Sequence, residues 1–223
     1  MFTVSETWRA AYPGAAAGVL VMENVANPES HPALDRLKDE LEGQIRGRLV
    51  DPPALRSDAR LQAYRAYYRR FDKTYHVQLQ LESVAFKGKS IPRVAALVET
   101  MFMAELKNML LTAGHDLDVV EPPVRLSIAS GTERYTRLNG QEQQLKAGDM
   151  FIADAQGVLS SVIYGPDQRT QILTGTRRAL FTVYVPPGIG EQAVAQHLKD
   201  IKAYVLLIAP EARTELLGVY GAA

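Results

Sequence analysis

The spacing of apolar residues changes along the chain at the Glu121-Pro122-Pro123 segment. Before it, apolar side chains recur with the period of a helix, whereas after it they alternate with polar ones as in a strand. The helical period returns near residue 189. Helices, then antiparallel strands, then a helix predict an α+β fold. We expect N-terminal helices around an antiparallel, partly barrel-like sheet, a closing C-terminal helix, and a single domain over residues 1–223.

Several segments have the pattern of helices. Apolar residues share one face over 33–49, and a second helix is expected to begin with Ser57 as its N-cap. A third helix is expected over 92–108, with a proline in its first turn, and the closing helix over 189–209. Residues 76–86 fit either a helix or a strand, because they satisfy both periods.

Short strands separated by turns are predicted in the second half of the chain. Asn139-Gly140 predicts a two-residue hairpin turn, in which both residues have positive φ. A further buried strand is expected near residues 19–21. The strand segments after the change of period are 124–128, 135–138, 150–154, 158–165 and 179–185.

The composition excludes several classes of protein. Hydrophobic residues make up 47% of the chain and the formal net charge is zero, so the chain as a whole is expected to fold and to lack a uniformly basic surface. It has no cysteine, which excludes disulfides and thiolate chemistry. Its apolar runs are too short for a membrane helix, and the N-terminus does not resemble a secretory signal. We therefore expect a cytoplasmic protein with no membrane partner.

His115 and Asp116 are the candidates for catalytic residues, because they form the one cluster of histidine and carboxylates together with Asp118. An imidazole titrates near neutral pH and can act as a general base. A solvated loop after a helix is the alternative, which the pattern favours. Because no third ligand is identifiable, we predict no metal and no other cofactor. The motifs for a serine nucleophile and for phosphate-binding loops are absent.

Positive charge is concentrated between residues 60 and 93, a segment that contains eight Lys and Arg but only two acidic residues. Tyrosines are interleaved with them, and cations beside aromatic rings suit phosphate contact combined with base stacking. The alternative is a solvated helix face whose tyrosines lie in the core. The residues expected to contact RNA are Arg65, Arg69, Arg70, Lys87 and Lys89.

An ordered series of short motifs resembles a known family. The series begins with Asp116 and Asp118 and continues with Gly131 and Glu133, Leu138-Asn139-Gly140, Ile152-Ala153-Asp154, Gly165 and Thr176. It is similar to the tRNA-binding and editing domain of the phenylalanyl-tRNA synthetase beta subunit. The AYRAYYRRF and KGKSIPRV segments resemble free-standing bacterial proteins built from that domain alone.

The resemblance implies a clamp that admits the mischarged end of a tRNA and hydrolyses tyrosine from it. Three positions depart from the family pattern. Ala113 stands where the family has a histidine, Met101 or Phe102 where it has an asparagine, and Phe181 where it has the glutamate that reads the tyrosine hydroxyl. Since these losses remove groups that would position water, we expect no tyrosine editing by the synthetase mechanism.

The resemblance also implies a substrate pocket, which we expect to involve Ser161, Gly165, Thr176 and Phe181. Phe181 would form an aromatic wall, unless it fills the pocket as part of the core. The first functional hypothesis is a solo domain that binds aminoacyl-tRNA, with hydrolysis of mischarged tRNA in trans as its reaction if it is an enzyme. The alternatives are a non-catalytic module for an amino acid or similar metabolite, and a partner-binding protein that keeps only the fold.

Overall fold

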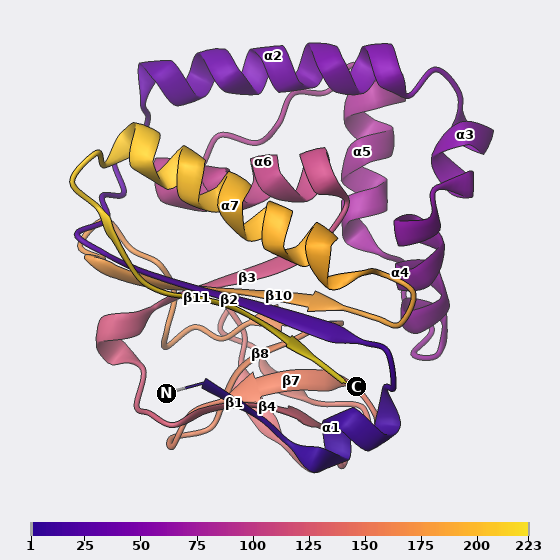
Figure 1. Cartoon of the computed structure of the whole chain (residues 1–223), viewed down its shortest axis with the longest axis vertical. Coiled ribbons are helices and arrows are strands. Elements are labelled where there is room, and N and C mark those ends of the chain that lie inside the picture. Colours follow the sequence, from indigo (N-terminus) through magenta and orange to yellow (C-terminus); the bar gives the residue numbers. More distant parts are fainter. Residues whose placement is uncertain (1, 223) are drawn as a thin grey trace.

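The computed structural model describes residues 2–222, which form two stacked β-sheets with a layer of helices over one of them (Figure 1). The sheet beneath the helices has four strands in the order β11-β2-β10-β3, and its neighbouring strands are antiparallel. These strands are β2 (Ala16–Glu23), β3 (Leu111–Asp116), β10 (Arg178–Val185) and β11 (Arg213–Gly221).

The second sheet has five strands in the order β1-β4-β7-β8-β9, antiparallel except for the parallel β1–β4 pair. The two sheets share no strand, so they stack and do not close into a barrel. The predicted α+β class is confirmed. The strands are β1 (Phe2–Val4), β4 (Val124–Ile128), β7 (Met150–Ala153), β8 (Val158–Ser161) and β9 (Gly165–Pro166), with a separate hairpin of β5 (Arg134–Thr136) and β6 (Glu142–Gln144).

The helix layer contains α2 (Pro32–Arg48), α5 (His76–Lys87), α6 (Ala96–Asn108) and α7 (Glu191–Ile208), as Figure 1 shows. Shorter helices are α1 (Glu6–Ala11), α3 (Pro52–Ser57), α4 (Ala59–Arg69) and the 3-10 turn Leu117–Val119. The closing helix α7 is followed by the edge strand β11, whose side chains are exposed or half-buried. Within residues 2–222, no helix is long and apolar enough to cross a membrane.

Two helix starts differ from the prediction. Asp58, rather than Ser57, caps α4 through its side chain, and Ser57 ends the preceding helix. Helix α6 begins about a turn later than predicted because Asn27 caps it from far away in the sequence: its side-chain oxygen accepts the Leu97 N–H at 2.9 Å. The ambiguous segment 76–86 is helical and ends at Gly88, which has a φ of 64°.

The Asn139-Gly140 hairpin turn also differs in type. Gly140 has a φ of 78°, whereas Asn139 is not among the residues with positive φ. The Gly140 N–H donates to the Arg137 carbonyl at 2.8 Å, which closes a turn with the left-handed residue in its last position. This is the longer hairpin connection, a turn followed by a glycine bulge, and not the two-residue form.

The interleaved tyrosines of α4 belong to the core and not to an RNA-stacking surface. Tyr64, Tyr67 and Tyr68 are buried, and their hydroxyls donate to groups on strands or directly next to them. Tyr68 reaches the Val162 carbonyl at 2.7 Å and Tyr67 reaches an Asp149 oxygen at 2.6 Å. The prediction of base stacking by these rings is wrong, because the apolar spacing of α4 directs them inward.

Candidate functional site

A cavity of about 540 Å³ lies where α5 and α6 meet the edge strand β3 and the β8–β9 hairpin. Its volume falls within the range of small-molecule sites in proteins, roughly 300–1,000 Å³. The exposed residues His76, Val94 and Leu138 form its rim. Its apolar walls include Val98, Met101, Phe102, Ala113, Val162, Pro166 and Ile172.

Glu105 is a buried acid in the lining of this apolar cavity, and only 2% of its surface is exposed. One of its carboxylate oxygens accepts the Thr112 N–H at 2.7 Å. Burial disfavours the charged form and raises the pKa of Glu105 to about 8. No Lys or Arg lines the cavity, so the charge of an ionised Glu105 would have no protein cation beside it within the described residues.

The residues expected to bind substrate occupy different places. Ser161 and Gly165 line the cavity, and Gly165 needs its glycine backbone because its φ is 83°. Thr176 does not line it: its hydroxyl donates to Asp116 at 2.6 Å and accepts the Leu173 N–H at 2.9 Å. Thr176 therefore links Leu173 to Asp116, the last residue of β3, and does not face a ligand.

Phe181 also lies outside the cavity lining and belongs to the core, with none of its surface exposed. Two residues along β10, Val183 pairs with Gly18, whose Cβ would meet α7, so Phe181 lies on the same helix-covered face. Side chains alternate along a strand, and it is Tyr184 of β10 that lines the cavity instead. The expected aromatic wall at Phe181 is therefore corrected: the residue fills the core.

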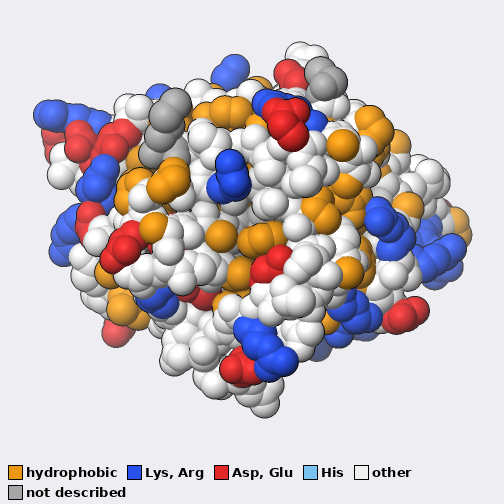
Figure 2. Space-filling model, turned by 90° about the horizontal axis from the view of Figure 1, so that it is seen from below, with side chains coloured by type: hydrophobic (Ala, Val, Ile, Leu, Met, Phe, Trp, Pro, Cys, Tyr) orange, Lys and Arg blue, Asp and Glu red, His pale blue; other side chains and the backbone are white. Residues whose placement is uncertain are grey.

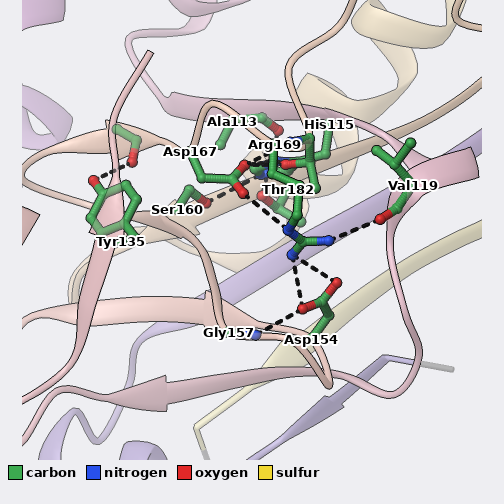
Figure 3. A network of polar contacts seen from close by, with 12 residues as sticks. Ala113, His115, Val119, Tyr135, Asp154, Gly157, Ser160, Asp167, Arg169 and Thr182 are labelled. Carbon is green, nitrogen blue, oxygen red and sulfur yellow. Dashed lines mark hydrogen bonds and ion pairs between the residues drawn. The ribbon is translucent and has the colours of Figure 1, made fainter. Parts of the chain in front are cut away.

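His115 is the centre of a buried polar network (Figure 3) and is not in a solvated loop as the pattern favoured. Its Nδ1 lies 2.7 Å from the Thr170 hydroxyl and its Nε2 lies 3.2 Å from the Ser160 hydroxyl. Burial lowers the pKa of His115 to about 3, so the imidazole is neutral near pH 7. Asp116 accepts hydrogen bonds from Thr176 and from the Asp118 N–H, and neither candidate lines the cavity.

Ser160, His115 and Asp167 are residue types that form a nucleophile, a base and an acid in hydrolases. Here the nearest Asp167 oxygen is 4.0 Å from His115 Nδ1, because the Thr170 hydroxyl lies between them. The Ser160 hydroxyl is fully buried and lies 2.7 Å from the Tyr184 hydroxyl. Without access for a substrate, this arrangement has no exposed nucleophile, and we assign it a structural role.

The same network continues to the surface through an ion pair. Both Asp154 oxygens lie 2.9 Å from Arg169, which also donates to the Val119 carbonyl at 2.8 Å. Asp154 in turn accepts the Gly157 N–H, as Figure 3 shows. These bonds tie the β7–β8 turn to the segment after β9. No group of three or more metal-ligating side chains occurs in residues 2–222.

Three positive side chains, Lys73, Lys89 and Arg137, lie beside the cavity, and we call them the basic rim. Lys89 lines a neighbouring cleft that shares His76 and Gln80 with the cavity. Lys73 Nζ lies 5.3 Å from the ring centre of Tyr164, the residue before Gly165. Arg137 lines a small cleft that shares Leu138 and Pro166 with the cavity, and its buried Nε has no hydrogen-bond partner in the described chain.

The remaining predicted RNA-contacting residues do not line the cavity. Arg65 and Arg69 line a cleft with Lys73, whereas Arg70 packs over the ring of Tyr12, and Lys87 is exposed at the end of α5. Figure 2 shows that on the face of the second sheet both signs of charge are mixed with apolar side chains.

A family model described as the B3/4 domain matches residues 60–211. This range covers the cavity, the buried network and the basic rim. The chain belongs to the B3/4 domain family. This domain also occurs in the phenylalanyl-tRNA synthetase beta subunit, so the resemblance seen in the sequence is confirmed.

Among solved structures, this B3/4 domain is similar to an N-terminal fragment of the phenylalanyl-tRNA synthetase beta subunit from Pyrococcus horikoshii. The TM-score is 0.51 at 12% sequence identity, and the match covers 98% of this chain and 53% of that chain. The likeness establishes a common fold, and the chain spans about half the length of that fragment. No curated protein sequence matches this chain.

Sequence reasoning missed Glu105, although its position carries a signal. Glu105 follows Leu97 and Met101 at intervals of four residues, so a helix places it in the row of inward-facing apolar residues. An acid in such a row is either paired in the core or faces a cavity. By contrast, two of the three departures from the family pattern lie in the cavity lining of this B3/4 domain: Ala113, and Met101 or Phe102, which both line it; the third, Phe181, does not.

Proposed function

We propose that this B3/4 domain binds the aminoacylated end of a tRNA. The aminoacyl group enters the cavity beside α6, and neighbouring phosphates contact the basic rim. The observation that carries the proposal is the combination of an apolar cavity of about 540 Å³ with Lys73, Lys89 and Arg137 around it. An acyl group needs a concave apolar site, and a polynucleotide needs cations.

Apolar residues dominate the cavity wall, which favours an aminoacyl group with an apolar side chain. Val98, Met101 and Phe102 form one wall, and the polar residues Gln80, Ser161 and Gln171 also line the cavity. A few polar groups in an apolar pocket orient a ligand, while the apolar area supplies affinity. Hydrolysis of mischarged tRNA in trans is the reaction that such binding would serve.

Tyrosine editing with the synthetase residues is not part of the proposal. Ala113 has no group that could position water, and Phe181 lies in the core. Loss of positioned acid–base groups costs typically about 100- to 10,000-fold in rate. Release of tyrosine from tyrosyl-tRNA is therefore expected to stay near the uncatalysed level.

Equilibrium binding to a panel of tRNAs tests the proposal. Each tRNA is measured in its aminoacylated and deacylated form by fluorescence anisotropy, and release of the amino acid is followed in parallel. We expect at least one aminoacylated form to bind about tenfold tighter than the same tRNA without its amino acid. Equal affinity for the two forms across the panel would contradict the proposal, whatever the salt dependence of binding.

A further inference from the structure

Glu105 has an unusual position for an acidic side chain, because it lines an apolar cavity and has only one hydrogen-bond partner. That partner is the Thr112 N–H, 2.7 Å from one carboxylate oxygen. The other oxygen accepts no hydrogen bond from any residue in the range 2–222. A buried carboxylate is stable only when it is paired, so this group is open to a partner from outside the protein.

The cations of the neighbouring elements are occupied elsewhere. Lys107, two residues along α6, pairs with Asp200 of α7 at 3.0 Å. Lys38 of α2 pairs with the buried Glu99. His197 of α7 lies behind Thr112, with its Nε2 2.6 Å from the threonine hydroxyl, and burial lowers its pKa to about 3, so it is neutral near pH 7.

The tyrosines around Glu105 do not supply charge either. Tyr64 and Tyr75 are wholly buried near Glu105 and stack on each other, with ring centres 4.2 Å apart. Burial raises the pKa of both rings, so both remain neutral. An ionised Glu105 would thus face only neutral groups within the described chain, together with His76 at the rim.

We propose that Glu105 binds the protonated amino group of the ligand that occupies the cavity. This inference rests on the proposed function and names its substrate class: an apolar amino acid whose carboxyl group is esterified or amidated and whose amino group is free. When the ligand binds, the proton that the buried carboxyl holds near neutral pH is released to solvent, and the ammonium group donates to the carboxylate oxygen that has no partner in the protein. A charged pair of this kind is stronger than a neutral hydrogen bond.

The same cavity disfavours a free amino acid. Among the described residues, its lining contains no Lys or Arg, so the carboxylate of a zwitterion would have no cation to pair with inside. An ester to the tRNA ribose removes that negative charge. The chemistry of the lining therefore selects the acylated form over the free amino acid, which distinguishes this proposal from a module that binds free amino acids.

Calorimetry with small amides tests the inference without tRNA. The probes are leucinamide, methioninamide and phenylalaninamide, each beside its N-acetylated form, which has no positive charge. We expect at least one free amide to bind about tenfold or more tighter than its N-acetylated form. Glu105→Gln, which keeps the acceptor for the Thr112 N–H, removes this difference. Glu82→Gln removes the same charge from a half-buried position outside the cavity lining and is the control.

Equal binding of the free and N-acetylated amides would overturn the inference. So would a folded Glu105→Gln variant that still prefers the free amides, or the absence of binding by all three amides at millimolar concentration. Thermal melting establishes that each variant is folded. Failure of the proposed function is a separate result: free amides would bind through Glu105 while aminoacylated and deacylated tRNA bind equally. Conversely, a preference for aminoacylated tRNA that N-acetylation does not change would refute the inference alone.

Discussion

Glu105 is protonated in the folded chain over a pH range in which it ionises once the chain unfolds. Burial raises its pKa from 4.5 to about 8. Between these values the folded state binds more protons than the unfolded state. The contribution of Glu105 to stability therefore falls as the pH rises from about 4.5 to 8.

Glu105→Gln is expected to remove this pH dependence. Relative to the wild type, the free energy of unfolding of the variant should rise by about 2–4 kcal/mol between pH 5 and pH 8, because glutamine does not ionise. Urea denaturation at several pH values measures the difference. The lowered pKa values of His115 and His197 make the folded state less stable toward acid. Both histidines are present in both proteins, so their contributions cancel in the difference. A constant difference across this range would show that Glu105 is ionised in the folded chain.

The alternation of side chains along β10 determines whether a residue faces the helices or the cavity, as Phe181 shows. Phe181 lies on the helix-covered face of β10, whereas Tyr184 lines the cavity. Phe181→Ala should lower the free energy of unfolding by about 3–5 kcal/mol, as expected for a buried phenylalanine. The milder Phe181→Leu should bind the amide probes with wild-type Kd. A changed Kd in that folded variant would place Phe181 in the site after all.

At the scale of elements, α7 packs on β2 at a point where only glycine fits. A Cβ on Gly18 would lie 2.6 Å from a Val194 methyl carbon and 3.1 Å from Leu198. Gly18→Ala should therefore displace the helix and cost about 1–3 kcal/mol of stability in thermal or urea denaturation. Gly43→Ala is the matched control, since nothing lies within 4 Å of its Cβ and α2 should gain up to about 1 kcal/mol. Equal effects of the two substitutions would contradict close packing of α7.

The basic rim comes from three segments: Lys73 lies in the loop between α4 and α5, Lys89 follows α5, and Arg137 lies in the β5–β6 turn. Lys73→Ala combined with Arg137→Ala should reduce the slope of log Kd against log salt by about 0.7 for each phosphate that these side chains neutralise. Lys199→Ala on α7 removes an exposed cation outside the clefts that adjoin the cavity and should leave the slope unchanged. The same slope in the double variant would mean that tRNA phosphates bind elsewhere.

Elements were predictable where one face is strongly apolar. The helix over 33–49 is α2, and the strand over 124–128 is β4. The sequence pattern was insufficient where a distant residue decides the boundary, as when Asn27 caps α6. It was also insufficient for β11, because an edge strand with half-exposed side chains has little hydrophobic alternation.

For the molecule as a whole, the cavity exists because segments that are far apart in the sequence meet at one edge of the stacked sheets. α5 and α6 supply one wall, β3 another, and residues 161–172 with Tyr184 the remainder. Because the walls come from distant segments, no local motif identifies the site. Ser161 and Gly165 were predicted from the family resemblance, whereas nothing in the resemblance pointed to Glu105. The family resemblance indicated which part of the chain forms the site, and the geometry of the lining indicated the chemistry of the ligand.

The proposed function requires that the cavity receives the aminoacyl group of a tRNA, and the ratio of Kd values for deacylated and aminoacylated tRNA tests this in three proteins. Val98→Trp fills the cavity from α6, and Val50→Trp makes the same change at a position that is 76% exposed. We expect a ratio of about ten or more for the wild type and Val50→Trp, and a ratio near one for Val98→Trp, with affinity for deacylated tRNA unchanged. A ratio near one in the wild type, or a preference that survives in folded Val98→Trp, would contradict this role of the cavity.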